Sequence, residues 1–282
     1  MAEYGGPAPD QWRGRDLGTR SVAYDARDVM LYALAVGARA DELDLVYERD
    51  LRVLPTFALT LAQWAPDVLA GLGAFGEGTA LHGGQRLVVR RPLPVSGSVT
   101  CSARVAEVWD KGTAAVFEVE VESEYFSAVW SVFAPGLGGF GGSRGPGRPP
   151  APEGAPSLRG RVATFRDQAA LYRLTGDRHL IHIDPEAASG IGQPRPILHG
   201  LCVLAASALR LARLTGSHPA DLVELEGRFA SPVLPGEVLD VLAWPDPAST
   251  AFGVERCGRA VLTGGRIRFA PASRTAGGPL AT

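Results

Sequence analysis

Lysine is almost absent from this chain of 282 residues. Lys111 is its single lysine, so arginine supplies nearly all of the 28 basic side chains, which stand against 30 acidic ones and give a formal net charge of -2. A surface that binds nucleic acid needs a stripe of positive charge that neighbouring acids do not cancel. The sequence holds no such stripe, and its composition therefore excludes a nucleic-acid partner.

Cysteine is equally scarce. Cys101, Cys202 and Cys257 are widely spaced and form no CxxC pair, so the sequence predicts neither a zinc site nor a disulfide framework. We expect each of them to be a small buried apolar residue. The N-terminal region lacks the basic start and apolar run of a signal peptide, and no apolar stretch approaches the roughly 18 residues of a membrane span. These absences predict a soluble, cytoplasmic protein with no membrane partner.

Apolar residues, in contrast, make up 46% of the chain, and its length fits two domains of ordinary size. In the first half, apolar residues at helical spacing predict a short helix from Asp25 and a longer apolar helix over residues 54–72. Residues 85–135 are rich in β-branched residues and are broken at Gly and Pro, which favours antiparallel strands. The segment "WDKGTA" is typical of a hairpin turn between two of them.

The clearest boundary is "GLGGFGGSRGPGRPPAPEGAP", residues 136–156. Its glycines permit most backbone angles and its prolines forbid helix and ladder hydrogen bonds, so we interpret it as a flexible interdomain linker. It separates a first unit over 21–135, preceded by a loose arm over 1–20, from a second unit over 157–282.

The order of elements repeats after this linker. Residues 167–176 predict a short helix or turn, residues 197–216 a long apolar helix, and residues 224–270 further strands. Both halves thus place an apolar helix before antiparallel strands, which indicates an internal duplication. A helix that is apolar on nearly every face must be covered on every face. We therefore predict an α+β fold in which two curved antiparallel sheets each wrap a long apolar helix.

Chemically useful side chains gather in "YRLTGDRHLIHIDPEAASGIGQPRPILHGLC", residues 172–202. An Asp and a His five residues apart, Asp177 and His182, can face one cavity from a short segment without strands. His179 and His199 lie nearby in the sequence. Gly200 opens the predicted long helix, and the unpaired N–H groups and partial positive charge of a helix N-terminus suit a developing oxyanion.

Structural roles compete for the same residues. Asp184 followed by Pro185 is typical of the cap of a short helix. His199 equally fits a packed or hydrogen-bonded role, and Asp177 after Gly176 fits a turn. Spacing alone leaves these alternatives open.

The stretch also resembles a known motif. The (R)-specific enoyl-CoA hydratases of the MaoC-like family, which have a hot-dog fold, carry a hydratase 2 motif of the form Y-R-L-S/T-G-D-x-N-P-L-H-x-D-P, followed by P-I-L-H-G-L-C. This sequence reads "YRLTGDRHLIHIDP" and then "RPILHGLC". The resemblance continues in "GRFASPVLPGE" downstream, and in "DVMLYALAVGA", "LPTF" and "LHGGQ" of the first half. It covers roughly residues 25 to 270 and implies a double hot-dog.

The resemblance implies a role for each matching residue. Asp177 and His182 correspond to the acid/base pair that adds water across an enoyl thioester, and the N–H of Gly200 to the group that binds the thioester oxygen. His82, Gly83, Lys111 and Arg228 fall on the path of the CoA thioester. For Lys111 an exposed charge in a hairpin turn is the alternative. The resemblance requires no metal or redox cofactor.

One position departs from the motif. Its usual Asn is His179 here, and its usual Pro is Leu180. A His can donate one hydrogen bond and accept another, so it can fill the supporting role of the Asn, and it adds a group that titrates near neutral pH.

The implied reaction is the reversible hydration of a trans-2-enoyl-CoA to the (R)-3-hydroxyacyl-CoA, with acyl-carrier protein as an alternative carrier. The first half shows no Asp and His at this spacing, so we predict one active site per chain. Two alternatives are a thioesterase, which would not need the paired His, and a catalytically weak subunit that binds acyl thioesters. Hot-dog proteins pair through sheet edges, so we expect a homodimer, although a two-unit chain already makes one such pairing internally.

Overall fold

A computed structural model describes residues 6–76 and 80–271. Its ten strands form a single antiparallel sheet in the order β1-β3-β4-β5-β2-β7-β10-β9-β8-β6. The first half supplies β1 (Asp16–Tyr24), β2 (Leu81–Val89), β3 (Gly97–Asp110), β4 (Ala114–Glu122) and β5 (Phe126–Pro135). The second half supplies β6 (Leu158–Ala163), β7 (Leu222–Phe229), β8 (Val238–Pro245), β9 (Thr250–Arg256) and β10 (Arg259–Phe269).

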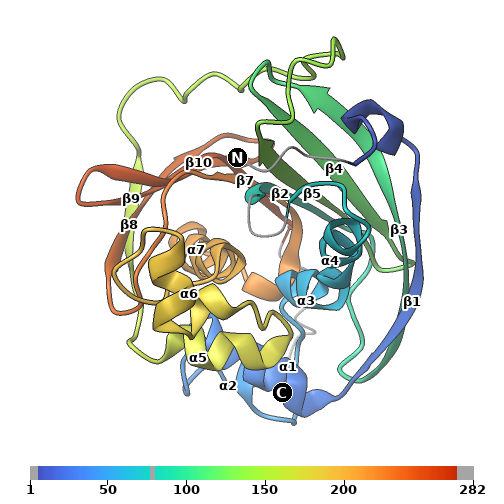
Figure 1. The fold of residues 1–282 in the computed structure, drawn as a ribbon. Coiled ribbons are helices and arrows are strands. Elements are labelled where there is room, and N and C mark those ends of the chain that lie inside the picture. Colours follow the sequence, from blue (N-terminus) through green and yellow to red (C-terminus); the bar gives the residue numbers. More distant parts are fainter. Residues whose placement is uncertain (1–5, 77–79, 272–282) are drawn as a thin grey trace, which may run out of the picture.

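The two halves share one topology. From the edge to the centre, the first half places β1, β3, β4, β5 and β2, and the second half places β6, β8, β9, β10 and β7 in the equivalent positions. The sheet curls around the helices, which lie on its concave side (Figure 1). This arrangement confirms the predicted α+β architecture. The two curved sheets are continuous, because β2 and β7 pair at the centre.

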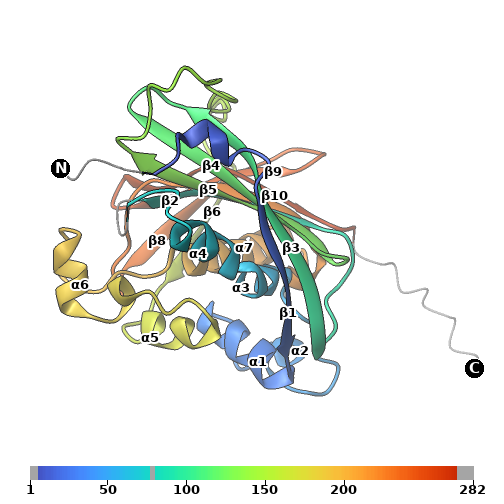
Figure 2. The same cartoon turned by 45° about the vertical axis from the view of Figure 1, so that its right-hand side comes forward.

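The helices occupy two layers (Figures 1 and 2). Against the sheet lie α7 (Gly200–Thr215) in the second half and α3 (Ala58–Ala62) with α4 (Trp64–Gly71) in the first. The open side is covered by α1 (Ala26–Ala35), α2 (Leu43–Val46), α5 (Gln168–Tyr172) and α6 (Pro185–Gly190). The remaining turns are the 3-10 segments η1 (Pro9–Trp12), η2 (Pro55–Phe57), η3 (Arg173–Thr175), η4 (Leu180–His182) and η5 (Pro219–Asp221).

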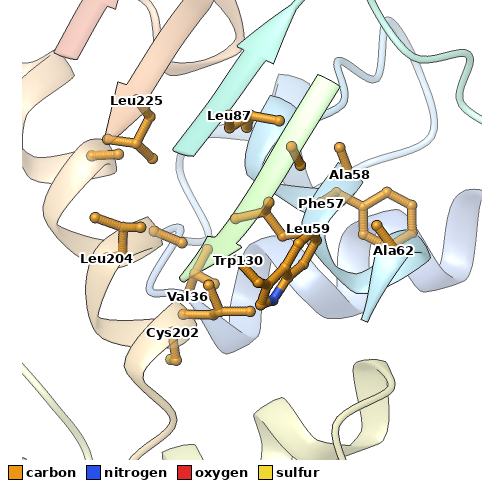
Figure 3. Packing of buried hydrophobic residues seen from close by; sticks show 14 of the residues in the cluster. Val36, Phe57, Ala58, Leu59, Ala62, Leu87, Trp130, Cys202, Leu204 and Leu225 are labelled. Atoms are coloured by element: carbon orange, nitrogen blue, oxygen red, sulfur yellow. The ribbon is translucent and has the colours of Figure 1, made fainter. Parts of the chain in front are cut away.

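The core is continuous between the halves. Leu204 of α7 and Leu225 of β7 are fully buried, as are Leu87 of β2 and Trp130 of β5 from the other half, and Figure 3 shows these side chains in one cluster. Eleven of the sixteen residues of α7 are buried, as the apolar sequence of this helix predicts. Gly227 of β7 allows α7 to pack close to the sheet, because a Cβ at residue 227 would lie 3.1 Å from Cδ1 of Leu204.

The predicted helix over 54–72 is wrong as a single helix. This segment begins with the 3-10 turn η2, and the helix that follows is divided at Gln63 into α3 and α4. Pro66 accounts for the break, because it has no N–H to donate to the carbonyl of residue 62.

The prediction of a loose arm over residues 1–20 is also wrong from residue 9 onward, where the chain is ordered. Trp12 is buried with 1% of its surface exposed, and β1 pairs with β3 from Asp16↔Arg104 to Tyr24↔Gly97. The sequence reasoning missed β6 as well. Both are edge strands, and edge strands show little of the apolar alternation that marks a strand in sequence.

Residues 136–149, which we call the strap, run along the outside of the sheet. They contain no helix or strand, but they are tied to the β3–β4 hairpin. The carboxylate of Asp110 accepts hydrogen bonds from the backbone N–H groups of Gly139 at 2.9 Å and Gly141 at 2.8 Å. The strap therefore has fixed contacts on the sheet.

Two further sequence expectations can be compared with the structure. Cys101 and Cys202 are buried, but Cys257 is exposed, because with Gly258 it forms the turn between β9 and β10, where both residues have positive φ. Among the described residues, no helix is long and apolar enough to cross a membrane.

Replacement of Leu204 by Ala should lower the free energy of unfolding by about 3 kcal/mol, because it empties a site in the shared core. Urea denaturation measures this loss. The matched control is Leu43→Ala, which removes the same atoms from a side chain that is 51% exposed and should change stability by less than about 0.5 kcal/mol. Equal losses in the two variants would contradict this description of the core.

Candidate active site

The motif segment forms a loop between α5 and α6. Gly176 has φ of +142°, a conformation that favours glycine, and the Oδ1 atom of Asp177 accepts the backbone N–H of His179 at 3.1 Å. The segment ends where Asp184 caps α6 by accepting the N–H of Glu186 at 2.7 Å. The capping role expected for Asp184 is confirmed. We call residues 176–182 the catalytic loop.

Two polar side chains of this loop, Asp177 and His182, meet a third, His199, which precedes α7. One ligand-type atom from each of Asp177, His182 and His199 lies within 4.8 Å of the other two. The imidazole rings of His182 and His199 stack, with centroids 3.6 Å apart and planes 24° apart. Residues 17 positions apart are thus brought together where the loop returns to the start of α7.

Hydrogen bonds define which ring nitrogens are free. His182 Nδ1 lies 2.8 Å from the carbonyl oxygen of Ile197, and His199 Nε2 lies 3.1 Å from the carbonyl oxygen of Asp177. Because a carbonyl only accepts, each of these nitrogens carries the hydrogen when its ring is neutral. His182 Nε2 and His199 Nδ1 are then left with free lone pairs.

Burial keeps both rings neutral. Burial lowers the pKa of His182, and the charge of Asp177 and the hydrogen bond to Ile197 oppose this shift. The pKa of His199 is also lowered, first by burial and then by the neighbouring His182. A buried neutral imidazole with a free Nε2 is suited to accept a proton near neutral pH.

Gly200 begins the sixteen-residue helix α7 directly after His199. A Cβ at Gly200 would lie 2.9 Å from the ring of Phe229, so a side chain at residue 200 would displace this ring. The first N–H groups of a helix have no partner within it. The N-terminus of α7 therefore lies next to His199, one of the two stacked histidines.

The first half adds His82 to the same region. Its ring packs against Phe229 with centroids 4.7 Å apart, and its Nε2 atom is buried without a hydrogen-bond partner among the described residues. Burial lowers the pKa of His82 to about 4, with opposing contributions from hydrogen bonds with the backbone of Gly84 and the side chain of Gln85 and then from the charge of Asp177. Gly83 follows at a bulge in the pairing of β2 with β5. His82 therefore lies beside Phe229, which packs against Gly200 at the start of α7.

Lys111 and Arg228 lie elsewhere, on the outer face of the sheet. The amine of Lys111 donates to the carbonyl of Arg144 in the strap, and Arg228 donates to the carbonyl of Gly147 at 3.4 Å. Burial lowers the pKa of Lys111, and the charges of Arg228 and Arg144 add to this effect. Since neighbours along a strand point to opposite faces, Arg228 is separated by the sheet from Phe229.

Sequence reasoning missed two aromatic neighbours of the site. Phe229 was quoted as part of "GRFASPVLPGE" without a role, yet it contacts both His82 and Gly200. Tyr172 is buried and lies 4.7 Å from the ring of His199. Their place in the motif was the only available signal, because their packing depends on the fold.

The cluster of Asp177, His182 and His199 has the composition of a metal site, but its geometry does not fit one well. The stacked rings hold their lone pairs in two nearly parallel planes, whereas the ligands of one tetrahedral ion point at it from well-separated directions. The arrangement suits proton transfer better.

Comparison with known proteins agrees with this description. Residues 22–133 match the MFE-2 hydratase 2 N-terminal domain, and residues 148–254 match the MaoC like domain. The chain is 38% identical over 250 residues to enoyl-CoA hydratase ChsH3 of Mycobacterium tuberculosis, covering 83% of this chain and 87% of that protein. It is 36% identical to 3-hydroxyacyl-thioester dehydratase Y of the same organism, covering 86% and 92%.

Solved structures show the same fold. A MaoC-like dehydratase from Phytophthora capsici superposes with a TM-score of 0.84 at 26% identity, covering 95% of this chain and 99% of the other. A Mycobacterium tuberculosis protein described as a double hotdog superposes with a TM-score of 0.59 at 13% identity, covering 93% and 98%. The fold is therefore a double hot-dog. The chain belongs to the MaoC-like hydratase 2 family.

The low pKa of His82 makes stability depend on pH. Folding lowers this pKa from 6.5 to about 4, so between these values the unfolded chain binds a proton that the folded chain does not. Stability is complete above pH 6.5 and falls as the pH drops below it, by on the order of 2 kcal/mol near about pH 5 from this residue alone.

Urea denaturation at about pH 7 and about pH 5 tests this linkage. His82→Gln should show a smaller loss of unfolding free energy between the two pH values than the unaltered chain. If both proteins lose the same amount, His82 is not a source of the acid sensitivity.

Proposed function

We propose that this protein catalyses the reversible hydration of trans-2-enoyl-CoA to (R)-3-hydroxyacyl-CoA at Asp177, His182 and Gly200. One observation carries the proposal: a carboxylate, a neutral histidine with a free Nε2 and the N-terminus of a long helix meet at one place. These are the groups that water addition to a conjugated thioester needs. The family relationship supports the same reaction.

The geometry supports an acid/base route for the proposed reaction. His182 Nε2 takes a proton from water as the water oxygen bonds to C3 of the enoyl group. The π electrons move toward the thioester oxygen, where the N–H of Gly200 stabilises the growing negative charge, a contribution of about 3 kcal/mol. The Asp177/His182 pair then returns a proton to C2, so that water is added across the double bond. No step uses a metal or a redox cofactor.

The acyl carrier is the next part of the proposal. Arg144 of the strap, together with Lys111 and Arg228, which donate to strap carbonyls, gives the outer face a group of cations. Phosphate groups of CoA are chemically suited to such a group. His82 and Gly83 lie at the start of β2, next to Gly84, which pairs with Arg228, and we propose that they contact the pantetheine part of the substrate.

Several finer points belong to the same proposal. We propose one active site per chain, a homodimer as the assembled form and the cytoplasm as the location. A thioesterase remains the alternative chemistry and an acyl-thioester-binding subunit the alternative role. The free Nε2 of His182 beside Asp177 favours the hydratase over both.

Asp177→Asn and His182→Gln should each lower the rate of hydration about a hundredfold or more, because each removes a proton-transfer group. Loss of the conjugated thioester absorbance of crotonyl-CoA and of a longer trans-2-enoyl-CoA measures the rate. Asp184→Asn is the matched control, since this aspartate caps α6 and should affect stability only.

Three results would contradict the proposal. Full activity in either variant would exclude the acid/base pair. Release of free CoA by the unaltered protein would indicate a thioesterase, and CoA binding with no turnover of any enoyl-CoA would indicate a binding subunit.

Lys111→Ala and Arg228→Ala should each raise KM for enoyl-CoA about tenfold and leave kcat nearly unchanged, because each removes a charged contact to the carrier. The same variants should leave KM unchanged for an enoyl-N-acetylcysteamine thioester, which has no phosphates. Arg266→Ala is the control, since this arginine pairs with Glu226 on the same sheet. Equal effects on both thioesters would contradict the phosphate contact.

A further inference from the structure

His199 occupies the position before α7 that usually belongs to a capping residue. A side chain at the N-cap of a helix normally accepts a hydrogen bond from one of the first N–H groups, but the ring of His199 makes no such bond. The residue is nevertheless almost fully buried, and a buried polar ring costs free energy unless it has partners. Its partners lie instead in the catalytic loop and in α5.

The first partner is the backbone of the catalytic loop. His199 Nε2 lies 3.1 Å from the carbonyl oxygen of Asp177 and donates to it when the ring is neutral. The other ring nitrogen, Nδ1, is buried without a hydrogen-bond partner in the described part of the chain. His199 thus uses one donor, and this donor ties the residue with the proposed catalytic carboxylate to the start of α7.

The second partner is the imidazole of His182. The two rings stack with their centroids 3.6 Å apart. Among the described residues, the ring of His182 has one hydrogen bond, which joins its Nδ1 to the carbonyl of Ile197. One hydrogen bond holds one atom of a ring and leaves the ring free to turn about that contact. The stack restricts this rotation, and it therefore sets the direction of the lone pair on His182 Nε2.

Tyr172 of α5 keeps His199 itself in place. The two ring centroids lie 4.7 Å apart, and the ring of Tyr172 lies 6.0 Å from that of Tyr32 in α1, which belongs to the first half. All these rings are buried. A row of aromatic rings thus extends from the first half to the proposed base His182. Because side chains in a close-packed interior have little freedom, this row gives His199 a fixed position.

We propose that His199 is a positioning residue for hydration: its Nε2 donor fixes the backbone of Asp177, and its ring fixes the plane of the His182 imidazole. This role rests on the function proposed above. Both catalytic side chains belong to a loop that contains only the short turn η4. A contact from the start of the long helix α7 therefore supplies an orientation that the loop does not supply by itself.

Substitutions that keep one contact at a time test this role. His199→Gln keeps an amide donor for the carbonyl of Asp177 and loses the ring. His199→Phe keeps a ring against His182 and loses the donor, and His199→Ala loses both. We expect kcat for crotonyl-CoA to fall about tenfold in the first two variants and about a hundredfold in the third, with KM changed less than about twofold, because misplaced proton-transfer groups slow the chemical step more than they weaken binding.

His218→Gln is the matched control. The ring of His218 is also hydrogen-bonded, at 2.8 Å to Arg52 and at 2.8 Å to Asp44, but it lies beyond the other end of α7. This change should leave kcat unaltered. Melting curves show which variants retain the fold, and the Gln and Phe variants decide the question if His199→Ala unfolds. Lower thermal stability with unchanged kcat in these variants would overturn the proposal, since His199 would then contribute to packing only.

NMR of the histidine rings tests the stack without any reference to activity. The chain has five histidines, and the spectrum of His182→Gln identifies the ring signals of His182. A stacked ring shields the protons of its neighbour. His199→Gln should therefore move the His182 signals downfield, and His199→Phe should leave them near their original positions.

Unchanged His182 signals in His199→Gln would contradict the proposal, because the ring of His182 would then keep its surroundings without the stack. If the unaltered protein hydrates no enoyl-CoA, the proposed function fails, while the NMR result still decides whether His199 holds the ring of His182.

Discussion

The ladder between β2 and β7 is the interaction on which the rest of this structure depends. Its register runs from Gly84↔Arg228 to Val88↔Glu224 and turns two half-sheets into one. Because of it, Leu87 and Leu225 lie opposite each other and close a single core. It also carries His82 to the ring of Phe229, which packs against Gly200. The site is thus assembled at the junction of two units.

This junction explains how one copy of a duplicated unit can have catalytic groups while the other supports it. The second half contributes the catalytic loop and the unbroken helix α7. The first half contributes the interrupted pair α3 and α4, on which the loop rests at Gly176. The site uses a helix N-terminus without a charged side chain and histidines that are buried in their neutral form. It therefore avoids the high free-energy cost of burying ions. The site can therefore be both apolar and reactive.

Much of the architecture could be predicted because it depends on local pattern. The apolar residues of α7, the strands of the two halves and the hairpin at Gly112 all have signals within a few residues. The edge strands β1 and β6 could not be predicted, since an edge exposes polar side chains on both faces. The break at Gln63 had a local cause in Pro66, and it was missed because the surrounding residues are apolar at helical spacing.

The residues of the site also fall into those that the sequence could predict and those that it could not. Asp177, His182 and Gly200 belong to one contiguous motif, so its resemblance to a family motif reached all three. Phe229 and the strap reach their positions only through tertiary contacts, which a single sequence does not encode in any local pattern. His179 is intermediate, because the motif marks it as a substitution and only the fold shows that it is exposed, with its ring 6.3 Å from that of His182.

The central claim is that this junction adds water to one face of an enoyl thioester. Chiral analysis of the product formed from crotonyl-CoA in D₂O tests it most directly. The account predicts (R)-3-hydroxybutyryl-CoA with a single deuterium at C2. A racemic or (S) product, or recovery of crotonate and free CoA, would contradict it.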